Sequence, residues 1–262
     1  WGSSNTDVWA VGKEGTTLHK NGLFWSNVVS NTKNDLTAIW GIAANDVWAV
    51  GNKGTIIHWD GLKWSASLSN TVTDLRSVWG SSGNDIWAVG VGGLILHWTG
   101  GPSWMASPSV MNDLNSVWGT SISNAWAVGA NNKFFHYDGS NWSYFSGGGS
   151  YTLTSIWGSN ANNIWAAGGT DSVLHYTGTS WLTGGFSVGT QLNAVWANSS
   201  NLWCVGNLGT IAVVDTPKFR FDGSTSGTSN VLHWVWGIGE NDVWAVGDGG
   251  TIIHRQMNPI SL

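Results

Sequence analysis

One short pattern recurs through the whole chain and limits its fold more than any other feature. It is clearest in the second copy, residues 40–51, which read WGIAANDVWAVG. Copies begin at Trp1, Trp40, Trp79, Trp118, Trp157, Trp196 and Trp236, so the starts lie 39 residues apart five times and then 40 residues apart. A period this regular predicts a tandem array of one small structural unit, in which each unit contacts only its neighbours.

Each unit contains four strand-like runs, which in the second copy cover residues 36–40, 46–50, 55–59 and a run that starts at Trp64. β-Branched and aromatic residues fill the runs, and Gly or Asn interrupts each one. The second run is apolar on both faces, so its sheet must be covered on both sides. Four-stranded antiparallel sheets packed side by side around an axis meet this requirement. We therefore predict an all-β, seven-bladed β-propeller with about 39 residues per repeat.

We expect residues 1–262 to form one propeller domain, as part of a longer chain. The two ends do not balance: the first copy lacks a run before Trp1, and the seventh lacks a Trp-bearing fourth run after His254. We expect residues 257–262 either to supply a short last strand or to stand where the first strand of the first blade belongs. Otherwise residues outside this sequence must close the ring, because an open ring exposes strand edges.

Tryptophan recurs at three positions of the repeat, which we expect to lie in the core between blades. A buried indole removes about 150–250 Å² from water, worth roughly 4–6 kcal/mol as an upper bound. The first set is the seven start positions. The second set is Trp9, Trp48, Trp87, Trp126, Trp165, Trp203 and Trp244, and the third is Trp25, Trp64, Trp104, Trp142 and Trp181, with Phe219 in the sixth copy.

A histidine recurs ten residues after the Trp of the second run, except in the sixth copy, which has Val213. The Asp or Asn two residues before that Trp is its expected hydrogen-bond partner. A metal site is not expected, because the propeller holds the histidines of different blades far apart. We expect no cofactor. The histidines are His19, His58, His97, His136, His175 and His254.

Composition excludes several classes of protein. The formal net charge is −5 and only 10% of residues are charged, which argues against a nucleic-acid binder. No apolar run is long enough to span a bilayer, so direct membrane insertion is not expected. The surface residues are mostly Asn, Ser, Thr and Gly, which is typical of secreted or cell-surface bacterial proteins. We therefore expect an extracellular or cell-surface location, and we expect the single Cys204 to be a buried structural thiol.

The run from Asn45 to Trp64, NDVWAVGNKGTIIHWDGLKW, resembles two groups of propeller repeats. Asp60 and Trp64 match the Asp-Gly-x-x-Trp core of the Asp-box (BNR) repeat, and so do Asp138 and Trp142. The same run is similar to the tectonin-like lectin repeat. Asn21, Thr99 and Thr177 replace the Asp in other copies, and the full Asp-box never appears. The lectin resemblance implies glycan binding, whereas Asp-box propellers include sialidases.

An enzyme is not expected. The resemblance to Asp-box sialidases implies that an active chain would need an arginine cluster, a Tyr–Glu nucleophile pair and an acidic residue. This chain has only three arginines, Arg76, Arg220 and Arg255, and two glutamates, Glu14 and Glu240. Most aspartates occupy the repeated turn and strand positions, which leaves no evident pair of catalytic carboxylates.

Binding residues are expected where the repeat is broken. The connections that vary most are residues 26–35, 65–74, 105–113, 143–152, 182–191 and 220–230. Within the first run, Arg76, His233 and Trp234 interrupt a row of small polar residues, so they are candidates for a glycan or peptide pocket. The alternative is that Trp234 plugs the centre of the ring.

A second candidate set occupies one slot of the third run. Trp59, Trp98, Tyr137 and Tyr176 could form repeated stacking sites between blades. Lys20, Val214 and Arg255 fill the same slot in other copies, which indicates a partly exposed position with no common ligand.

Taken together, the sequence predicts a non-catalytic extracellular binding or interaction module for a glycan or a protein partner. Two alternatives stay open. One is a structural domain of a larger surface or filament assembly, which would self-associate or contact other domains of its chain. The other is a sialidase-like glycoside hydrolase.

Overall fold

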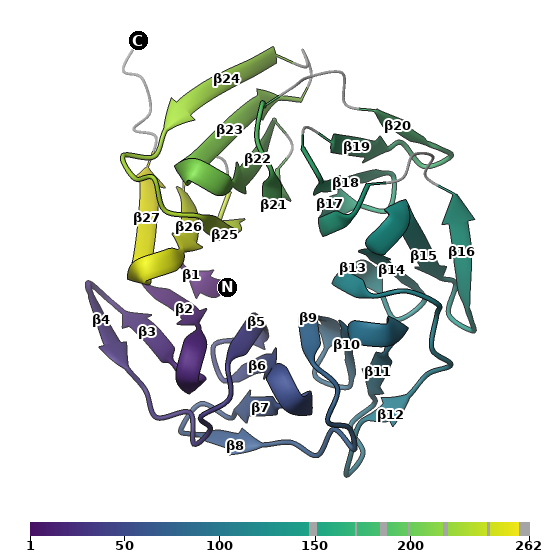
Figure 1. Ribbon diagram of the computed structural model, residues 1–262. Coiled ribbons are helices and arrows are strands. Elements are labelled where there is room, and N and C mark those ends of the chain that lie inside the picture. Colours follow the sequence, from purple (N-terminus) through teal and green to yellow (C-terminus); the bar gives the residue numbers. More distant parts are fainter. Residues whose placement is uncertain are drawn as a thin grey trace. The chain divides into compact units, whose positions relative to one another are not determined.

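The computed structural model describes residues 1–146, 151–170, 172–183, 188–198, 200–216, 220–239 and 242–256. These residues form seven antiparallel sheets, one for each repeat, which confirms the predicted all-β propeller of seven blades (Figure 1). The described part of the chain has no α-helix, and it contains no helical segment long and apolar enough to cross a membrane. The chain divides into two compact units, residues 1–145 and 146–262.

The first unit contains blades 1 to 4. Blade 1 has β1 (Gly2–Ser4), β2 (Asp7–Val11), β3 (Thr17–Asn21) and β4 (Phe24–Asn27); blade 2 has β5 (Leu36–Ala43), β6 (Asp46–Gly51), β7 (Ile56–Trp59) and β8 (Trp64–Ala66). Blade 3 has β9 (Leu75–Ser82), β10 (Asp85–Gly90), β11 (Ile95–Trp98) and β12 (Met105–Ala106); blade 4 has β13 (Leu114–Ser121), β14 (Asn124–Gly129), β15 (Lys133–Tyr137) and β16 (Trp142–Ser146).

The second unit contains blades 5 to 7. Blade 5 has β17 (Leu153–Asn160), β18 (Asn163–Gly168), β19 (Ser172–Tyr176) and β20 (Trp181–Thr183); blade 6 has β21 (Leu192–Ala197), β22 (Asn201–Gly206), β23 (Thr210–Asp215) and β24 (Arg220–Thr225). Blade 7 has β25 (Leu232–Gly237), β26 (Asp242–Gly247) and β27 (Thr251–Gln256).

Blade 7 differs from the prediction of four strands, because its described residues form a three-stranded sheet. The segment expected to supply a last strand, residues 257–262, lies outside the described residues, as does Phe219 of the third aromatic set. The first strand of blade 2 is longer than predicted. It continues past Trp40 to Ala43, because Gly41 and Ala43 keep pairing with Val47 and Asp46 across a tight turn.

The strand register brings the recurring residues into one row across each blade. In blade 2, Trp40 lies opposite Trp48 and Trp48 lies opposite His58. The second strand is covered on both faces, as predicted: Val47, Trp48, Ala49 and Val50 are all buried.

Neighbouring blades adhere through indole rings. Trp9 of blade 1 meets Trp64 of blade 2 edge to face, with ring centroids 5.2 Å apart. The same contact joins Trp48 to Trp104 and Trp87 to Trp142 at 5.5 and 5.3 Å. All second-set tryptophans are buried, and the described members of the other two sets are buried or half-buried. The expected core role of the tryptophans is therefore confirmed.

Within each unit the first strand of a blade contacts the first strand of the next blade, and it forms the inner edge of the blade in Figure 1. A Leu recurs at the start of this strand, and the residue after it links the two blades in the two cases that follow. Thr37 donates to the carbonyl of Val50 in its own blade and to that of Leu75 in the next. Thr154 makes the same pair of bonds to Ala167 and Leu192.

A short 3₁₀ turn joins the second and third strands of six blades. These turns are η1 (Lys13–Gly15), η2 (Asn52–Gly54), η3 (Val91–Gly93), η4 (Ala130–Asn132), η5 (Asn207–Gly209) and η6 (Asp248–Gly250). The third position is Gly in five turns; at Gly54, with φ +68°, a Cβ would lie 2.1 Å from the carbonyl oxygen of Thr71. The middle residue is also left-handed, with φ of 55–57° at Glu14, Lys53, Asn131 and Leu208.

Cys204 lies in β22 and is fully buried, as predicted. Burial raises the pKa of its thiol to about 12, because the apolar surroundings disfavour the charged thiolate.

Candidate binding surface

The 3₁₀ turns and the connections between blades meet at one end of the blades, which we call the η face. Three backbone contacts show this: the N–H groups of Glu14, Lys53 and Gly92 donate to carboxylates at the start of the next blade. The acceptors are Asp35, Asp74 and Asp113, at 2.7–2.9 Å. The other two turns of each blade lie at the opposite end, which we call the hairpin face.

Large apolar side chains are exposed on the η face of the first unit. Val72 and Met111 are 84% and 89% exposed, and they occupy equivalent repeat positions, 39 residues apart. Val29 and Leu68 form a second equivalent pair and are also exposed. Three exposed lysines, Lys13, Lys33 and Lys53, belong to the same turns and connections. This face therefore offers aliphatic and basic side chains together.

The hairpin face also exposes apolar residues, namely Leu23, Phe24 and Leu62. Here the predicted Asp-box positions have a structural role. The carboxylate of Asp60 accepts the N–H groups of Leu62 and Lys63, both at 2.9 Å, which lowers the pKa of Asp60. Asp138 does the same for Ser140 and Asn141. The repeated Asp thus shapes a tight turn.

Arg76, a predicted ligand residue, links blade 3 to blade 4. Its guanidinium donates to the side-chain oxygens of Asn115 at 2.6 Å and Asp113 at 2.9 Å. The pKa of Asp113 is lowered, first by the Gly92 N–H and then by Arg76. About a third of the Arg76 side chain is exposed.

His233 and Trp234, the other two residues of that candidate pocket, lie in β25 of the second unit, whereas Arg76 belongs to the first. Nε2 of His233 lies 2.8 Å from Oδ1 of Asp248, and both side chains are more than half exposed. Trp234 is half-buried. It stands where the other blades have small buried residues, which are Ala38, Ser77, Ser116, Ser155 and Ala194.

The aromatic slot of the third strand packs against the blade before it. Trp59 lies 5.0 Å from Trp9, Trp98 lies 5.2 Å from Trp48, and Tyr137 lies 4.7 Å from Trp87, measured between ring centroids. All three are half-buried. Tyr176 lies 5.4 Å from Trp181 of its own blade, and its hydroxyl donates to the carbonyl of Gly178.

The other residues of this slot have a comparable environment. Arg255 lies over the ring of Trp203 at 5.2 Å, and Val214 shares a buried cluster with Trp165. Aromatic, aliphatic and guanidinium groups can all cover an indole, which explains why the slot tolerates such different residues. The sequence indicated a partly exposed position but missed this shared packing role.

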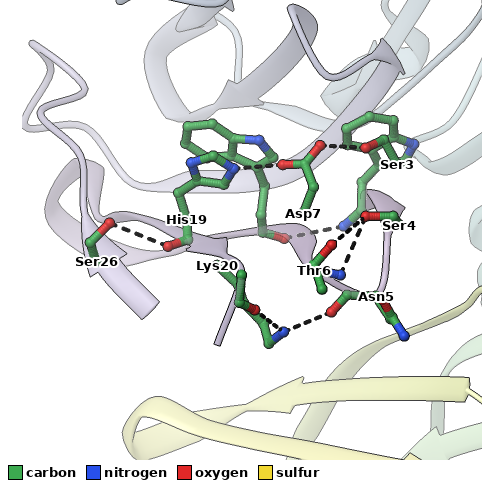
Figure 2. A network of polar contacts seen from close by, with 11 residues as sticks. Ser3, Ser4, Asn5, Thr6, Asp7, His19, Lys20 and Ser26 are labelled. Atoms are coloured by element: carbon green, nitrogen blue, oxygen red, sulfur yellow. Dashed lines mark hydrogen bonds and ion pairs between the residues drawn. The ribbon is translucent and has the colours of Figure 1, made fainter. Parts of the chain in front are cut away.

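The recurring histidines make the predicted hydrogen bonds in all six blades. Each Nε2 lies 2.5–2.8 Å from the side-chain oxygen of the Asp or Asn in its own blade. In blade 1 this carboxylate, Asp7, also accepts from Ser3, as Figure 2 shows. Figure 2 also shows Lys20 reaching the carbonyl of Asn5, at 2.7 Å.

Each histidine ring also packs on the second-strand Trp of its blade, with centroids 3.7–4.3 Å apart. The rings are thus held on one side by an indole and at Nε2 by an oxygen. Within the part of the chain that the structure describes, no three His, Cys, Asp or Glu residues are grouped as metal ligands would be.

Sequence reasoning missed Leu208, the middle residue of η5. Its side chain is 76% exposed although its backbone is left-handed, with φ +56°. A comparison of the same turn position across copies, which reads Glu14, Lys53, Gly92, Asn131, Leu208 and Gly249, would have singled it out.

No protein-family model matches the chain, and no curated protein matches it. Solved structures do. YCF48 bound to a D1 peptide matches with a TM-score of 0.70 and 19% identity, over 87% of this chain and 81% of that one. YCF48 from Cyanidioschyzon merolae matches with a TM-score of 0.76 and 15% identity, over 98% and 93%. The chain shares the fold of YCF48. At these identities the likeness extends to the fold alone, and the Asp-box and tectonin-like resemblance gains no support from the comparisons.

Proposed function

We propose that this chain is a non-catalytic binding module whose η face holds a polypeptide partner. One observation carries the proposal: large aliphatic and thioether side chains are exposed at repeat-equivalent positions on the blade connections, as Val72 and Met111 are. Exposed apolar side chains that gather on one surface are typical of interaction sites. Exposed lysines beside them would add attraction to acidic groups of a partner.

The likeness to YCF48 supports a polypeptide ligand, since one of the matching structures has a peptide bound. It supports the class of ligand only, because so little of the sequence is shared. The identity of the partner and its binding residues therefore rest on this chain's own surface.

A glycan is the other partner that the sequence left open. Sugar rings stack on flat aromatic faces, but Trp59, Trp98 and Tyr137 are already packed against the tryptophans of the preceding blades. The large apolar side chains exposed on the η face of the first unit are Val, Leu and Met, which suit peptide side chains better. The extracellular or cell-surface location is part of this proposal, and it rests on the surface composition.

The test is a selection of random linear peptides displayed on phage against the immobilised chain. Affinities of the synthetic peptides would then be measured by calorimetry. The double variant Val72→Asn/Met111→Asn removes the apolar pair on the η face. The matched control, Phe24→Asn/Leu62→Asn, makes the same change on the hairpin face. We expect the first variant to weaken binding about tenfold or more, equivalent to about 1.4 kcal/mol, and the control to leave it unchanged.

Equal weakening by both variants would contradict the choice of face. A glycan array run in parallel tests the class of ligand. Glycan binding that Trp234→Ala abolishes, with no peptide enriched, would replace this proposal with the lectin reading. Self-association in light scattering, with neither ligand bound, would favour the structural alternative.

A further inference from the structure

One polar contact of the repeat loses its acceptor between blades 6 and 7. In blades 1 to 3 the middle residue of the 3₁₀ turn donates its N–H to an Asp at the start of the next blade. In blade 6 the turn residue is Leu208, and the residue at the Asp position is Val231. The turn η5 contacts β25, as the earlier turns contact the strands that follow them. A valine side chain has no acceptor, so the backbone N–H of Leu208 has no carboxylate to bind at this position, and the two side chains here are both apolar.

Leu208 also has a left-handed backbone, which is unfavourable for a bulky residue. Blades 3 and 7 have Gly92 and Gly249 at this position, whereas Glu14, Lys53 and Asn131 hold the same backbone in η1, η2 and η4. The Leu208 side chain gains little burial in return, because it is 76% exposed. The left-handed backbone therefore belongs to the turn, and what distinguishes η5 is that its middle residue presents a large apolar side chain to solvent.

The charges beside Leu208 define what the site would accept. The carbonyl of Val231 accepts a hydrogen bond from the backbone N–H of Asp248 at 2.9 Å, so Asp248 lies next to Val231. Its carboxylate is half exposed and is held by His233. Among the described residues of the second unit at this end, no Lys or Arg is present. The surroundings of Leu208 and Val231 are therefore acidic, whereas the η face of the first unit carries lysines.

We propose that Leu208, Val231 and the Asp248 carboxylate form a contact site for a polypeptide segment that carries a large apolar side chain next to a Lys or Arg. The apolar side chain covers Leu208 and Val231, and the cation pairs with Asp248. Nε2 of His233 lies 2.8 Å from Oδ1 of this carboxylate, and both side chains are more than half exposed. This assignment rests on the proposed function and gives it a second contact site with its own specificity.

The decisive variant is Leu208→Gly, because it removes the side chain and relieves the backbone at the same time. A loss of binding then cannot be attributed to loss of folding, and the melting temperature should be no lower than in the wild type. Glu14→Gly is the matched control, since Glu14 has the same left-handed position in η1. Asp248→Asn tests the basic residue.

The measurement uses the same random-peptide selection, run separately on the wild type and on the three variants. We expect the wild type to enrich peptides with Lys or Arg beside Leu, Ile, Met or Phe. Leu208→Gly should weaken binding of these peptides about tenfold while Glu14→Gly does not, and Asp248→Asn should abolish the preference for a basic residue.

Two other outcomes overturn the inference and are distinguishable. If peptides enrich on the wild type but bind Leu208→Gly equally well, this site is wrong and the proposed function stands. If no peptide enriches on the wild type, the proposed function fails and this site fails with it.

Discussion

The recurring histidine illustrates how a single side chain is used in this protein. Its ring covers the second-strand Trp, and its Nε2 reaches an Asp in four blades and an Asn in blades 4 and 5. The two Asn blades differ in charge from the others. Burial lowers the pKa of His136 and of His175. The partner of Nε2 in these two blades is an amide oxygen, which carries no charge to offset the burial. The spacing of ten residues predicted the hydrogen bond but not the stacking on Trp, which depends on the register of the hairpin.

This difference predicts how stability depends on pH. A histidine has a pKa of about 6.5 in the unfolded chain, and that of folded His175 is lower, so the unfolded state binds the proton more readily. The contribution is complete above about pH 7 and is lost as the pH falls below about 6.5 toward the folded pKa. Asn163→Asp places a carboxylate opposite His175, so the loss of unfolding free energy on acidification should shrink by about 1 kcal/mol.

Urea unfolding at about pH 7.5 and pH 5.5 measures this change. The reciprocal variant Asp85→Asn removes the carboxylate opposite His97 and should make the loss steeper. Identical pH dependence in the wild type and both variants would show that the partner of the histidine does not control its protonation.

The blade is the element that stabilises this fold, and its stability comes from its neighbours. In blades 1 to 3 the second-strand Trp meets its own histidine, the fourth-strand Trp of the next blade, and the slot residue of the next blade's third strand. The alternation of residues predicted the four strands, and the two-sided apolar second strand predicted that blades pack face to face. The slot of Trp59 could not be assigned from sequence, because its residue types differ from copy to copy although the packing role is shared.

The contact between blades predicts unequal costs for equivalent tryptophans. Trp64 is 1% exposed and meets Trp9 edge to face, whereas Trp25 is half-buried in blade 1. Trp64→Ala should therefore lower the free energy of unfolding by about 3–5 kcal/mol, and Trp25→Ala by clearly less. Chemical denaturation of both variants measures the difference. Equal costs would mean that the packing of blade 2 against blade 1 is no tighter than the environment of Trp25.

For the whole molecule, the period of the sequence predicted the number of blades but carried little information about the partner. Residues that recur from copy to copy are used for the fold: the tryptophans for adhesion and the histidines of six blades for hydrogen bonds within blades. In two blades Asp60 and Asp138 shape turns. Function must then lie in the departures from the repeat. Some departures were visible in sequence, such as His233 and Trp234. Leu208 was missed: aligning the turn position across copies would have drawn attention to it, but its left-handed backbone is evident only in the structure.

The same reasoning predicts that the chain does not hydrolyse sialosides. Arg76 is engaged by Asp113 and Asn115, and Arg255 lies over Trp203, so neither is presented as a free carboxylate-binding group. A fluorogenic sialoside should show no turnover above the buffer rate, with an authentic sialidase as the positive control. Turnover that Arg76→Met abolishes would contradict this prediction and return the glycoside hydrolase to consideration.

The burial of Cys204 has a practical consequence. A thiol that is fully enclosed, with a pKa of about 12, does not react with alkylating reagents or form mixed disulfides while β22 stays in place. Since it is the chain's single cysteine, the rate of its alkylation measures how often the second unit opens around β22. Alkylation of Cys204 therefore reports local opening without an added label. The same burial keeps this thiol from forming disulfides with other copies of the chain in an oxidising environment.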